Sequence, residues 1–307
     1  MASLVEAWGG FKPLLAAADT MRLLELSNWA LMIVGGVILL SYLAAGITHG
    51  DRTSTDLAPP RSCRLTPEIL FVPILAYLLA VVALHPLTTW WLGETSASGT
   101  TETGDAVQVP TTAGVLANNL AHVVGAVACY LVGRQLIATR ERPFVVGDRR
   151  YGQYFLDGLV GVLVAIALCQ SALYLTMWVT LKLSPEFAFP AHDVIDALRA
   201  PDRPDWLPVA LWIGVTLVTP VAEEFFFRGL LQTGLARALK SRWLAVVAAS
   251  VIFGLAHSSQ PHVIPAITLF GVILGLLYER RGSLVGPIIA HTLFNAKTLL
   301  WTALAGV

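Results

Sequence analysis

Side chains that could carry out hydrolysis are concentrated in the last third of the chain, inside otherwise apolar sequence. Residues 221–229 read VAEEFFFRG, residues 253–257 read FGLAH, and residues 291–295 read HTLFN. A charged side chain in a membrane-like stretch is costly, so such a residue is a functional candidate by default. Two carboxylates, one arginine, two histidines and one amide in three segments exceed what structural hydrogen bonding alone would require.

Helical geometry separates the two glutamates of the first segment. Successive helix residues turn by about 100°, which puts Arg228 about 40° from Glu224 but about 140° from Glu223. We therefore expect Glu224 and Arg228 to form a structural ion pair and Glu223 to face another helix without a local counter-ion. An unpaired carboxylate in apolar surroundings is a stronger base than a paired one, as a general base requires.

The other two segments supply hydrogen-bonding groups that complement such a base. His291 and Asn295 are four residues apart, hence on one helix face, and two convergent donors could form an oxyanion hole. His257 follows Phe253 by one helical turn and could help Glu223 to hold and deprotonate a water. The predicted reaction is attack of that water on a peptide carbonyl, without an acyl-enzyme.

Each polar residue also has a structural interpretation. A single histidine in a membrane helix is about as often a helix-to-helix hydrogen bond as a catalyst. We give that interpretation to the polar residues of the earlier helices, namely His85, His122, Asn118 and Asn119, and expect His262 to be a loop residue.

Zinc is an alternative to a metal-free site. Two histidines and a glutamate make a plausible three-ligand zinc set. The sequence has no H-E-x-x-H segment, however, and Asn295 would be a poor zinc ligand. We favour a metal-free, cofactor-free mechanism and keep zinc as the less favoured alternative.

The elements that must position these residues are membrane-spanning helices. The chain of 307 residues is 56% hydrophobic and only 13% charged, with a mean hydropathy of +0.69, whereas soluble domains are about a quarter charged. The net charge of zero gives no indication of a nucleic-acid partner. The three cysteines are scattered and suggest buried small apolar residues, not a disulfide framework. Apolar blocks long enough to span a bilayer predict an all-α polytopic membrane bundle of about eight transmembrane helices, near 27–47, 67–92, 112–133, 154–181, 206–238, 243–258, 262–279 and 284–305.

Loop charges predict how the bundle is oriented. Arginine and lysine gather in four loops, 48–66, 134–152, 237–242 and 279–283, which fall on one side of an eight-helix bundle. Basic loops stay cytoplasmic, so both termini are predicted to be non-cytoplasmic in a bacterial-type cell membrane. Residues 4–24 could form a short helix on the membrane surface. We divide the chain into an N-terminal transmembrane region, 1–205, and a catalytic transmembrane core, 206–307.

Two features of that core bear on how the site is assembled. The block at 206–238 is too long for one straight span, and Pro220 is expected to kink it. His257 ends a helix that starts at Trp243, so it lies either towards the outer leaflet or in a short helix that stops within the membrane.

The three segments together resemble the signature of the CPBP family, which contains the type II CAAX prenyl endopeptidases and bacteriocin-processing proteases. Its pattern of EExxxR, FxxxH and HxxxN corresponds to residues 223–228, 253–257 and 291–295. The connecting sequence GLLYERRGSLVGPIIAH, at 275–291, is also similar. The resemblance covers roughly residues 206–300, and no motif position departs from it.

The resemblance implies a bundle of about eight helices and a glutamate-type intramembrane protease, a class formerly taken for metalloproteases. Glu223 would be the general base, and His257 would help to position the water. His291 and Asn295 would stabilise the oxyanion. The family's prenyl proteases open to the cytosol, which sets the expectation for this chain.

Three functions follow from these observations. The first is an intramembrane endopeptidase acting on a prenylated CAAX protein, a leader peptide or a membrane-embedded segment. The second is a non-catalytic scaffold or immunity protein of the same fold, which could keep the ion pair but would not need both histidines and the asparagine. The third is a transporter with a proton relay, which would require more titratable groups. We favour the endopeptidase, with the lipid bilayer and a peptide or protein substrate as its partners.

Overall fold

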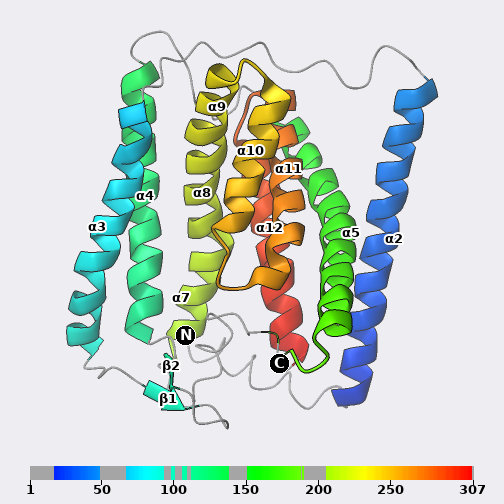
Figure 1. Cartoon of the computed structure of the whole chain (residues 1–307), viewed down its shortest axis with the longest axis horizontal. Helices are drawn as coiled ribbons and strands as arrows, with labels where there is room; N and C mark the ends of the chain where they lie inside the picture. The colour runs from blue at the N-terminus through cyan, green and yellow to red at the C-terminus, as the bar shows by residue number, and fades with distance from the viewer. Residues whose placement is uncertain are drawn as a thin grey trace.

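The chain folds into an all-helical bundle, as predicted (Figure 1). The computed structural model describes residues 17–48, 67–92, 98–100, 106–108, 112–137, 151–187, 189 and 205–305. All eight predicted apolar blocks correspond to helical stretches within these ranges. They are α2 (Ala17–Thr48), α3 (Pro67–Leu92), α4 (Thr112–Ile137), α5 (Tyr151–Leu183), the composite stretch that begins with α7 (Leu207–Ile213), α10 (Arg242–Leu255), α11 (Ile264–Arg281) and α12 (Val285–Ala305).

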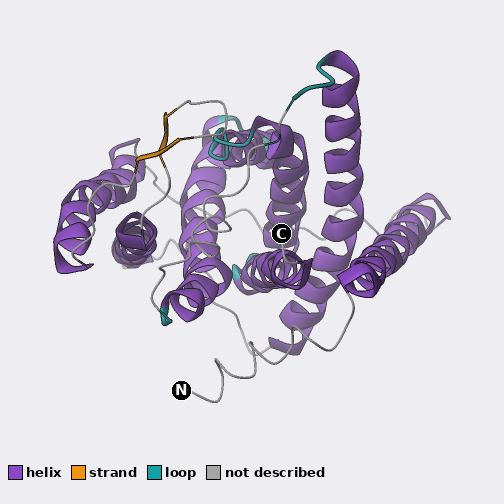
Figure 2. Ribbon diagram, turned by 90° about the horizontal axis from the view of Figure 1, so that it is seen from below, coloured by secondary structure: helices purple, strands orange, loops and turns teal. Residues whose placement is uncertain are grey.

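The only strands in the described residues are two three-residue segments between α3 and α4. β1 (Ser98–Thr100) and β2 (Ala106–Gln108) pair antiparallel, and they lie at the periphery of the bundle when it is seen from below (Figure 2). They do not change the fold class.

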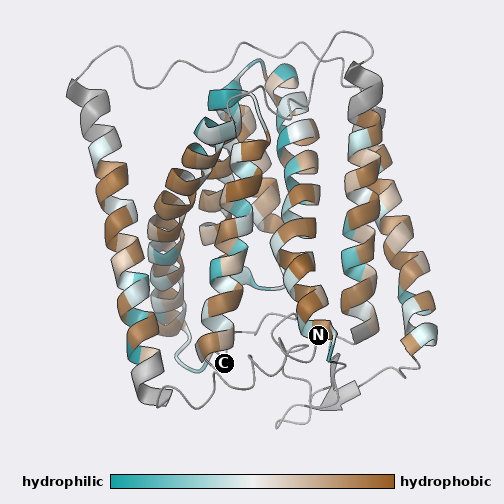
Figure 3. Cartoon of the chain, turned by 180° about the vertical axis from the view of Figure 1, so that it is seen from behind, coloured by the Kyte–Doolittle hydropathy of each residue, from teal (hydrophilic) through white to brown (hydrophobic). Residues whose placement is uncertain are grey.

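The outer surface of the bundle is that of a multi-pass integral membrane protein. Within the described residues, six helical stretches are long and apolar enough to cross a bilayer, and α10 is a shorter apolar helix. Large apolar side chains cover the outward faces, for example Leu40 on α2 and Val82 on α3, which are 66% and 73% exposed. Hydrophobic colour runs over most of the length of the outer helices (Figure 3). Such faces require lipid, because a soluble protein rarely exposes so large an apolar area.

The long block at 206–238 is a continuous run of helix whose geometry changes along its length. It passes through α7, a π-helical segment η1 (Gly214–Val218), α8 (Thr219–Glu224), a second π segment η2 (Phe225–Gln232) and α9 (Thr233–Ala238). Pro220 lies in the first turn of α8, directly after η1. The departure from regular helix is therefore spread over two π segments and is not confined to Pro220. π segments are frequent at functional sites.

α10 stops within the depth of the bundle. It has only 14 residues and is followed by a tight turn, by the 3-10 segment η3 (Pro261–Val263) and by α11. In two opposite views, the connection between α10 and α11 lies well short of the lower end of α12 (Figures 1 and 3). Of the two placements expected for His257, the short helix that ends inside the bundle is the one observed.

Small residues allow the central helices to approach closely. A Cβ added at Gly158 on α5 would lie 2.8 Å from Ile289 on α12, and one at Gly271 on α11 would lie 2.9 Å from Ser250 on α10. Close contacts of this kind are typical of membrane helix packing. They bring α12 close to α5, and α11 close to α10.

The N-terminal surface helix is only partly covered by the described residues. Residues 4–16 lie outside them, and residues 17–24 are the first turns of α2 itself. Helix ends alternate so that the four basic loops attach at one end of the bundle, whereas α2 starts and α12 ends at the other (Figure 1). Which end is cytoplasmic remains a prediction.

Candidate active site

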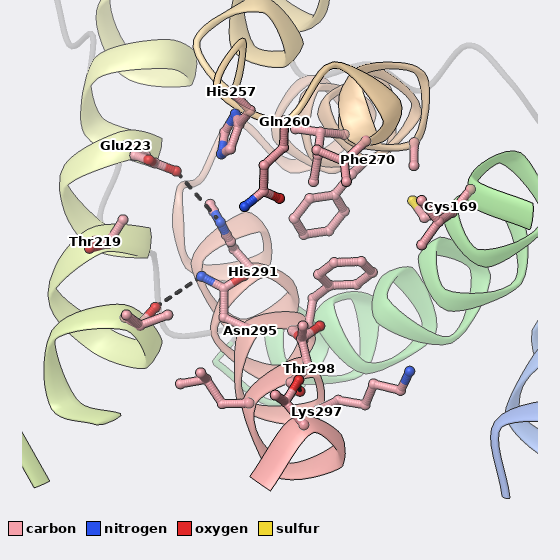
Figure 4. Close-up of a pocket in the computed structure, with 18 of the residues that line it drawn as sticks. Cys169, Thr219, Glu223, His257, Gln260, Phe270, His291, Asn295, Lys297 and Thr298 are labelled. Carbon is pink, nitrogen blue, oxygen red and sulfur yellow. Dashed lines mark hydrogen bonds and ion pairs between the residues drawn. The ribbon is translucent and has the colours of Figure 1, made fainter. Parts of the chain in front are cut away.

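The four residues predicted to be catalytic line one cavity of about 800 Å³. Glu223 comes from α8, and His257 from the turn after α10. His291 and Asn295 come from one face of α12. In Figure 4 their side chains converge on the space between α8 and α12. The structure therefore brings together residues that are far apart in sequence, since Glu223 precedes His257 by 34 positions and His257 precedes His291 by 34 positions.

Glu224 and Arg228 form a buried ion pair beneath the site. Arg228 Nη1 donates to Glu224 Oε1 at 2.7 Å, with the two side chains 1% and 0% exposed. Arg228 Nη2 also donates to the carbonyl of Gly271 at 3.1 Å, which connects the pair to α11. The guanidinium lies 4.6 Å from the ring centroid of Phe253, within the range of a cation–π interaction.

His291 joins the ion pair to the cavity. Its Nδ1 lies 2.9 Å from Glu224 Oε1, and its Nε2 lies 3.6 Å from Glu223 Oε2. Because a carboxylate held by an arginine can only accept, Nδ1 carries a proton that it donates to Glu224. A carboxylate in that position fixes the ring orientation of a histidine, as in metal sites and catalytic triads. Glu224 thus aims His291 Nε2 at the cavity, a role that the sequence did not suggest.

Glu223 differs from its neighbour in environment. Its side chain is 18% exposed, and it lines the cavity while Glu224 is fully enclosed. In the described residues its ion-pair contact is with His291, at the 3.6 Å given above. A carboxylate in this position is accessible to water.

His257 presents one ring nitrogen to the cavity. Its Nδ1 lies 2.9 Å from the backbone carbonyl of Phe253, one helical turn earlier. A carbonyl oxygen only accepts, so Nδ1 is the protonated nitrogen, and in the neutral ring Nε2 is an acceptor. His257 can therefore accept a hydrogen bond from a water or from a hydroxyl group in the cavity.

Asn295 is positioned by a carbonyl that Pro220 leaves free. In the π segment η1, the N–H of Thr219 donates to the carbonyl of Gly214. The carbonyl of Val215 would next receive the N–H of residue 220, but proline has none. Asn295 Nδ2 donates to that carbonyl instead, at 2.9 Å. Its second N–H remains for a ligand, because an amide nitrogen carries two donors.

Aromatic rings form the walls between these polar groups. Phe253 is 1% exposed and packs edge-on against both His257 and His291, with centroid distances of 5.2 and 5.8 Å. Phe270 on α11 packs edge-on against His291 at 5.2 Å. The Phe of the FxxxH segment thus spaces the two imidazoles and covers the ion pair. Sequence reasoning singled out Phe253 only as a reference point for His257 and did not single out Phe270 at all.

A second cavity of about 430 Å³ adjoins the first, and Glu223 and His257 line both. Its walls are mostly apolar and come from α3, α4, α8, η2 and the end of α10. Tyr77 on α3 donates to Asn118 Oδ1 on α4 at 2.7 Å, and His122 Nδ1 lies 2.8 Å from the Asn118 carbonyl. We interpreted Asn118 and His122 as structural, and these are helix-to-helix and intrahelical bonds. Asn118 and His122 also line both cavities, which the sequence did not indicate.

The described residues contain no group of three or more His, Cys, Asp and Glu side chains arranged to hold a metal ion. Cys129 and Cys169 are buried and unpaired, and Cys63 lies outside the described residues. His262 lies in η3, between α10 and α11, and also lines the larger cavity.

Comparison with known proteins agrees with the predicted resemblance. Residues 205–297 match the family described as "Type II CAAX prenyl endopeptidase Rce1-like". The chain is 36% identical over 87 residues to "Uncharacterized protein YpbD" of Bacillus subtilis (strain 168). That alignment covers 27% of this chain and 41% of the relative. No solved structure matches the chain. Residues 205–297, which the family model matches, contain all three motif segments.

Proposed function

Residues 205–297 form an Rce1-like domain, and from that premise we propose that this multi-pass membrane protein is an intramembrane endopeptidase that uses Glu223 to activate water. The observation that carries the proposal is the convergence of Glu223, His257, His291 and Asn295 on one cavity. A non-catalytic scaffold would need the ion pair between Glu224 and Arg228, but it would not need two histidines and an amide directed at one space.

The proposed reaction begins with a water between Glu223 and His257. Glu223 accepts one proton of the water while His257 Nε2 accepts a hydrogen bond from the other. The hydroxide equivalent attacks the carbonyl carbon of the scissile peptide bond, and the carbonyl oxygen becomes an oxyanion. Glu223 then gives the proton to the leaving nitrogen, so that the C–N bond breaks and a carboxylic acid and an amine form; the acid proton then passes to the amine, and a carboxylate and an ammonium are released.

His291 and Asn295 would stabilise the oxyanion. Asn295 offers the N–H of Nδ2 that its bond to Val215 leaves over. His291 can donate from Nε2 only as the imidazolium, because Nδ1 already donates to Glu224. The charged groups here are the carboxylates of Glu223 and Glu224 and the guanidinium of Arg228. A protonated His291 brings their total formal charge to zero. Two such donors in a water-poor site contribute a factor of about 10²–10³ each.

The substrate is proposed to be a peptide segment with an apolar or lipid-modified neighbour. The second, mostly apolar cavity reaches the same Glu223 and His257, so a prenyl group or an apolar side chain could lie there while the scissile bond faces the water. A prenylated CAAX protein and a leader peptide both fit this description.

A strain comparison tests the proposed function. Membrane-fraction proteomics of the wild type and of a Glu223→Gln strain should reveal peptides that persist uncleaved only in the variant. Purified protein should cleave such a peptide, and Glu223→Gln should lower kcat by about 10²- to 10⁴-fold without loss of folded protein. Glu25→Gln, on the exposed face of α2, is the matched control. Full activity of Glu223→Gln would eliminate the general-base role.

The metal-free mechanism is proposed separately from the protease assignment. Activity should survive dialysis against a chelator, and elemental analysis should find no stoichiometric zinc. Zinc lost together with activity, and restored together with it, would favour the alternative in which the histidines and Glu223 hold a metal.

A further inference from the structure

Among the described residues, four line both cavities, and all four are polar or charged. Two of them, Glu223 and His257, hold the water in the proposed mechanism. The other two, Asn118 and His122, lie one helical turn apart on α4, in the part of the chain that precedes the family motifs. A peptide that extends from the apolar cavity into the larger one passes all four side chains. The two α4 residues are therefore placed to contact the substrate beside the bond that is cut.

The side-chain amide of Asn118 has a fixed orientation. Tyr77 on α3 donates its hydroxyl proton to Asn118 Oδ1 at 2.7 Å. The Tyr77 ring packs edge-on against His122, with centroids 5.0 Å apart, and His122 Nδ1 lies 2.8 Å from the Asn118 carbonyl. The oxygen of the amide is thus occupied on the α3 side, and its nitrogen is the group that remains for a ligand.

The backbone of α4 is fixed at the same level. A Cβ added at Gly214 in η1 would lie 2.5 Å from Asn119 Oδ1, so the residue next to Asn118 packs directly on the composite helix. Asn118 is therefore held from two sides, by α3 through Tyr77 and by η1 through its neighbour. A donor that is already in place costs less conformational entropy when a ligand binds.

The remaining group of Asn118 is a neutral donor, which identifies its ligand as a hydrogen-bond acceptor. An amide nitrogen carries two N–H groups, and those of Asn118 have no protein acceptor within the residues that the structure describes. A polar group on a membrane helix is costly unless water or a ligand meets it. In a peptide whose apolar groups occupy the second cavity, the acceptors that reach Asn118 are backbone carbonyls.

We propose that Asn118 Nδ2 donates to a backbone carbonyl of the substrate next to the scissile bond, and that Tyr77 acts through Asn118 as a positioning residue. The inference rests on the proposed function. Because this carbonyl does not react, its hydrogen bond is equally strong in the bound substrate and in the transition state. Its loss should therefore raise KM and leave kcat unchanged, whereas loss of an oxyanion donor such as Asn295 should lower kcat.

The test uses a quenched fluorescent peptide that ends in farnesyl-Cys-Ala-Ala-Leu. Asn118→Leu, which removes the donors at similar size, should raise KM about three- to tenfold with kcat unchanged, as expected for one neutral hydrogen bond. Tyr77→Phe should give part of this rise, and no further rise when combined with Asn118→Leu.

Thr88→Val is the matched control. Thr88 Oγ1 on α3 lies 3.0 Å from the Ala113 carbonyl on α4, so this variant removes a polar contact between the same two helices, but Thr88 lines neither cavity. It should leave KM unchanged. An unchanged KM in Asn118→Leu would overturn the proposal, and so would an equal rise in Thr88→Val, since the effect would then come from helix packing.

A thioamide scan identifies the carbonyl and separates failure of this proposal from failure of the proposed function. Each non-scissile carbonyl of the peptide is replaced in turn by a thiocarbonyl, which is a weaker acceptor, and binding to Glu223→Gln protein is measured with and without Asn118→Leu. One position should weaken binding several-fold only while Asn118 is present, and this supports the proposal even if the wild type cleaves none of the peptides. Equal losses in both proteins overturn it even if the wild type cleaves them all. Absence of both binding and cleavage would overturn both proposals.

Discussion

Replacing Glu224 should damage the protein in a different way from replacing Glu223, although the two are adjacent. Glu224 is 0% exposed and accepts from Arg228 at 2.7 Å and from His291 at 2.9 Å. Glu224→Leu would leave the guanidinium, itself 1% exposed, without its counter-ion. Breaking a buried pair by removing one partner costs about 3–5 kcal/mol, and a chain of this size loses about 2–4 °C per kcal/mol. We expect the Tm to fall by about 6–20 °C.

A double variant separates stability from activity. Glu224→Leu combined with Arg228→Met removes both charges, and apolar replacement of a buried pair is often neutral or stabilising. Most of the lost Tm should therefore return. Activity should stay low, because His291 Nδ1 would still lack the carboxylate that orients its ring. Glu223→Gln is the reciprocal control, since it should lower kcat by about 10²- to 10⁴-fold while the Tm stays within about 2 °C.

Thermal unfolding of detergent-solubilised protein, followed by tryptophan fluorescence, and cleavage of a reporter peptide give the two readouts. The division of roles would be refuted by a Glu224→Leu protein that is as stable and as active as the wild type. It would also be refuted if Glu223→Gln, not Glu224→Leu, were the unstable variant. Recovery of activity in the double variant would show that His291 does not depend on Glu224 for its orientation.

The remaining predictions concern the backbone and the topology. Pro220→Ala restores an N–H that can donate to the Val215 carbonyl, so Asn295 should lose its hydrogen bond to that carbonyl. We expect kcat/KM to fall about five- to tenfold, and the free energy of unfolding to stay unchanged or to rise. An unaltered kcat/KM would argue against the role of this hydrogen bond. Gly271→Ala places a Cβ 2.9 Å from an α10 side chain and should cost about 1–3 kcal/mol in chemical unfolding, whereas Gly36→Ala, with nothing within 4 Å, should cost nothing. Reporter fusions after the last residue should show a non-cytoplasmic C-terminus, and cytoplasmic enzyme activity of the reporter would reverse the predicted orientation.

Hydropathy and motif spacing predicted the elements of this fold, because each span is a long apolar block with its own boundaries. The eight blocks all correspond to helices, and the angular argument placed Glu224 beside Arg228 and Glu223 away from it. Local periodicity was sufficient for these predictions, since both properties depend on residues within one helix.

The parts that sequence could not supply depend on contacts between helices. The bond from Asn295 to the Val215 carbonyl requires a π segment that no residue pattern here announces, although Pro220 was a visible signal of disturbed bonding. The role of Glu224 in orienting His291 spans 67 positions in sequence. Lys297 on α12, which lines the larger cavity, was not singled out either, because a lone lysine near a helix end usually extends to the membrane surface.

The structure connects two expectations about orientation that the sequence treated separately. The larger cavity is lined by Asn28 near the start of α2, by Gly114 near the start of α4 and by Thr302 near the end of α12. It therefore lies in the half of the bundle opposite the ends where the four basic loops attach (Figure 1). If basic loops are cytoplasmic, the cavity belongs to the non-cytoplasmic half. If the cavity opens to the cytosol, as the family resemblance led us to expect, the basic loops must be non-cytoplasmic and the C-terminus cytoplasmic. For the larger cavity the two expectations exclude each other, so locating the C-terminus decides on which side of the membrane this cavity lies.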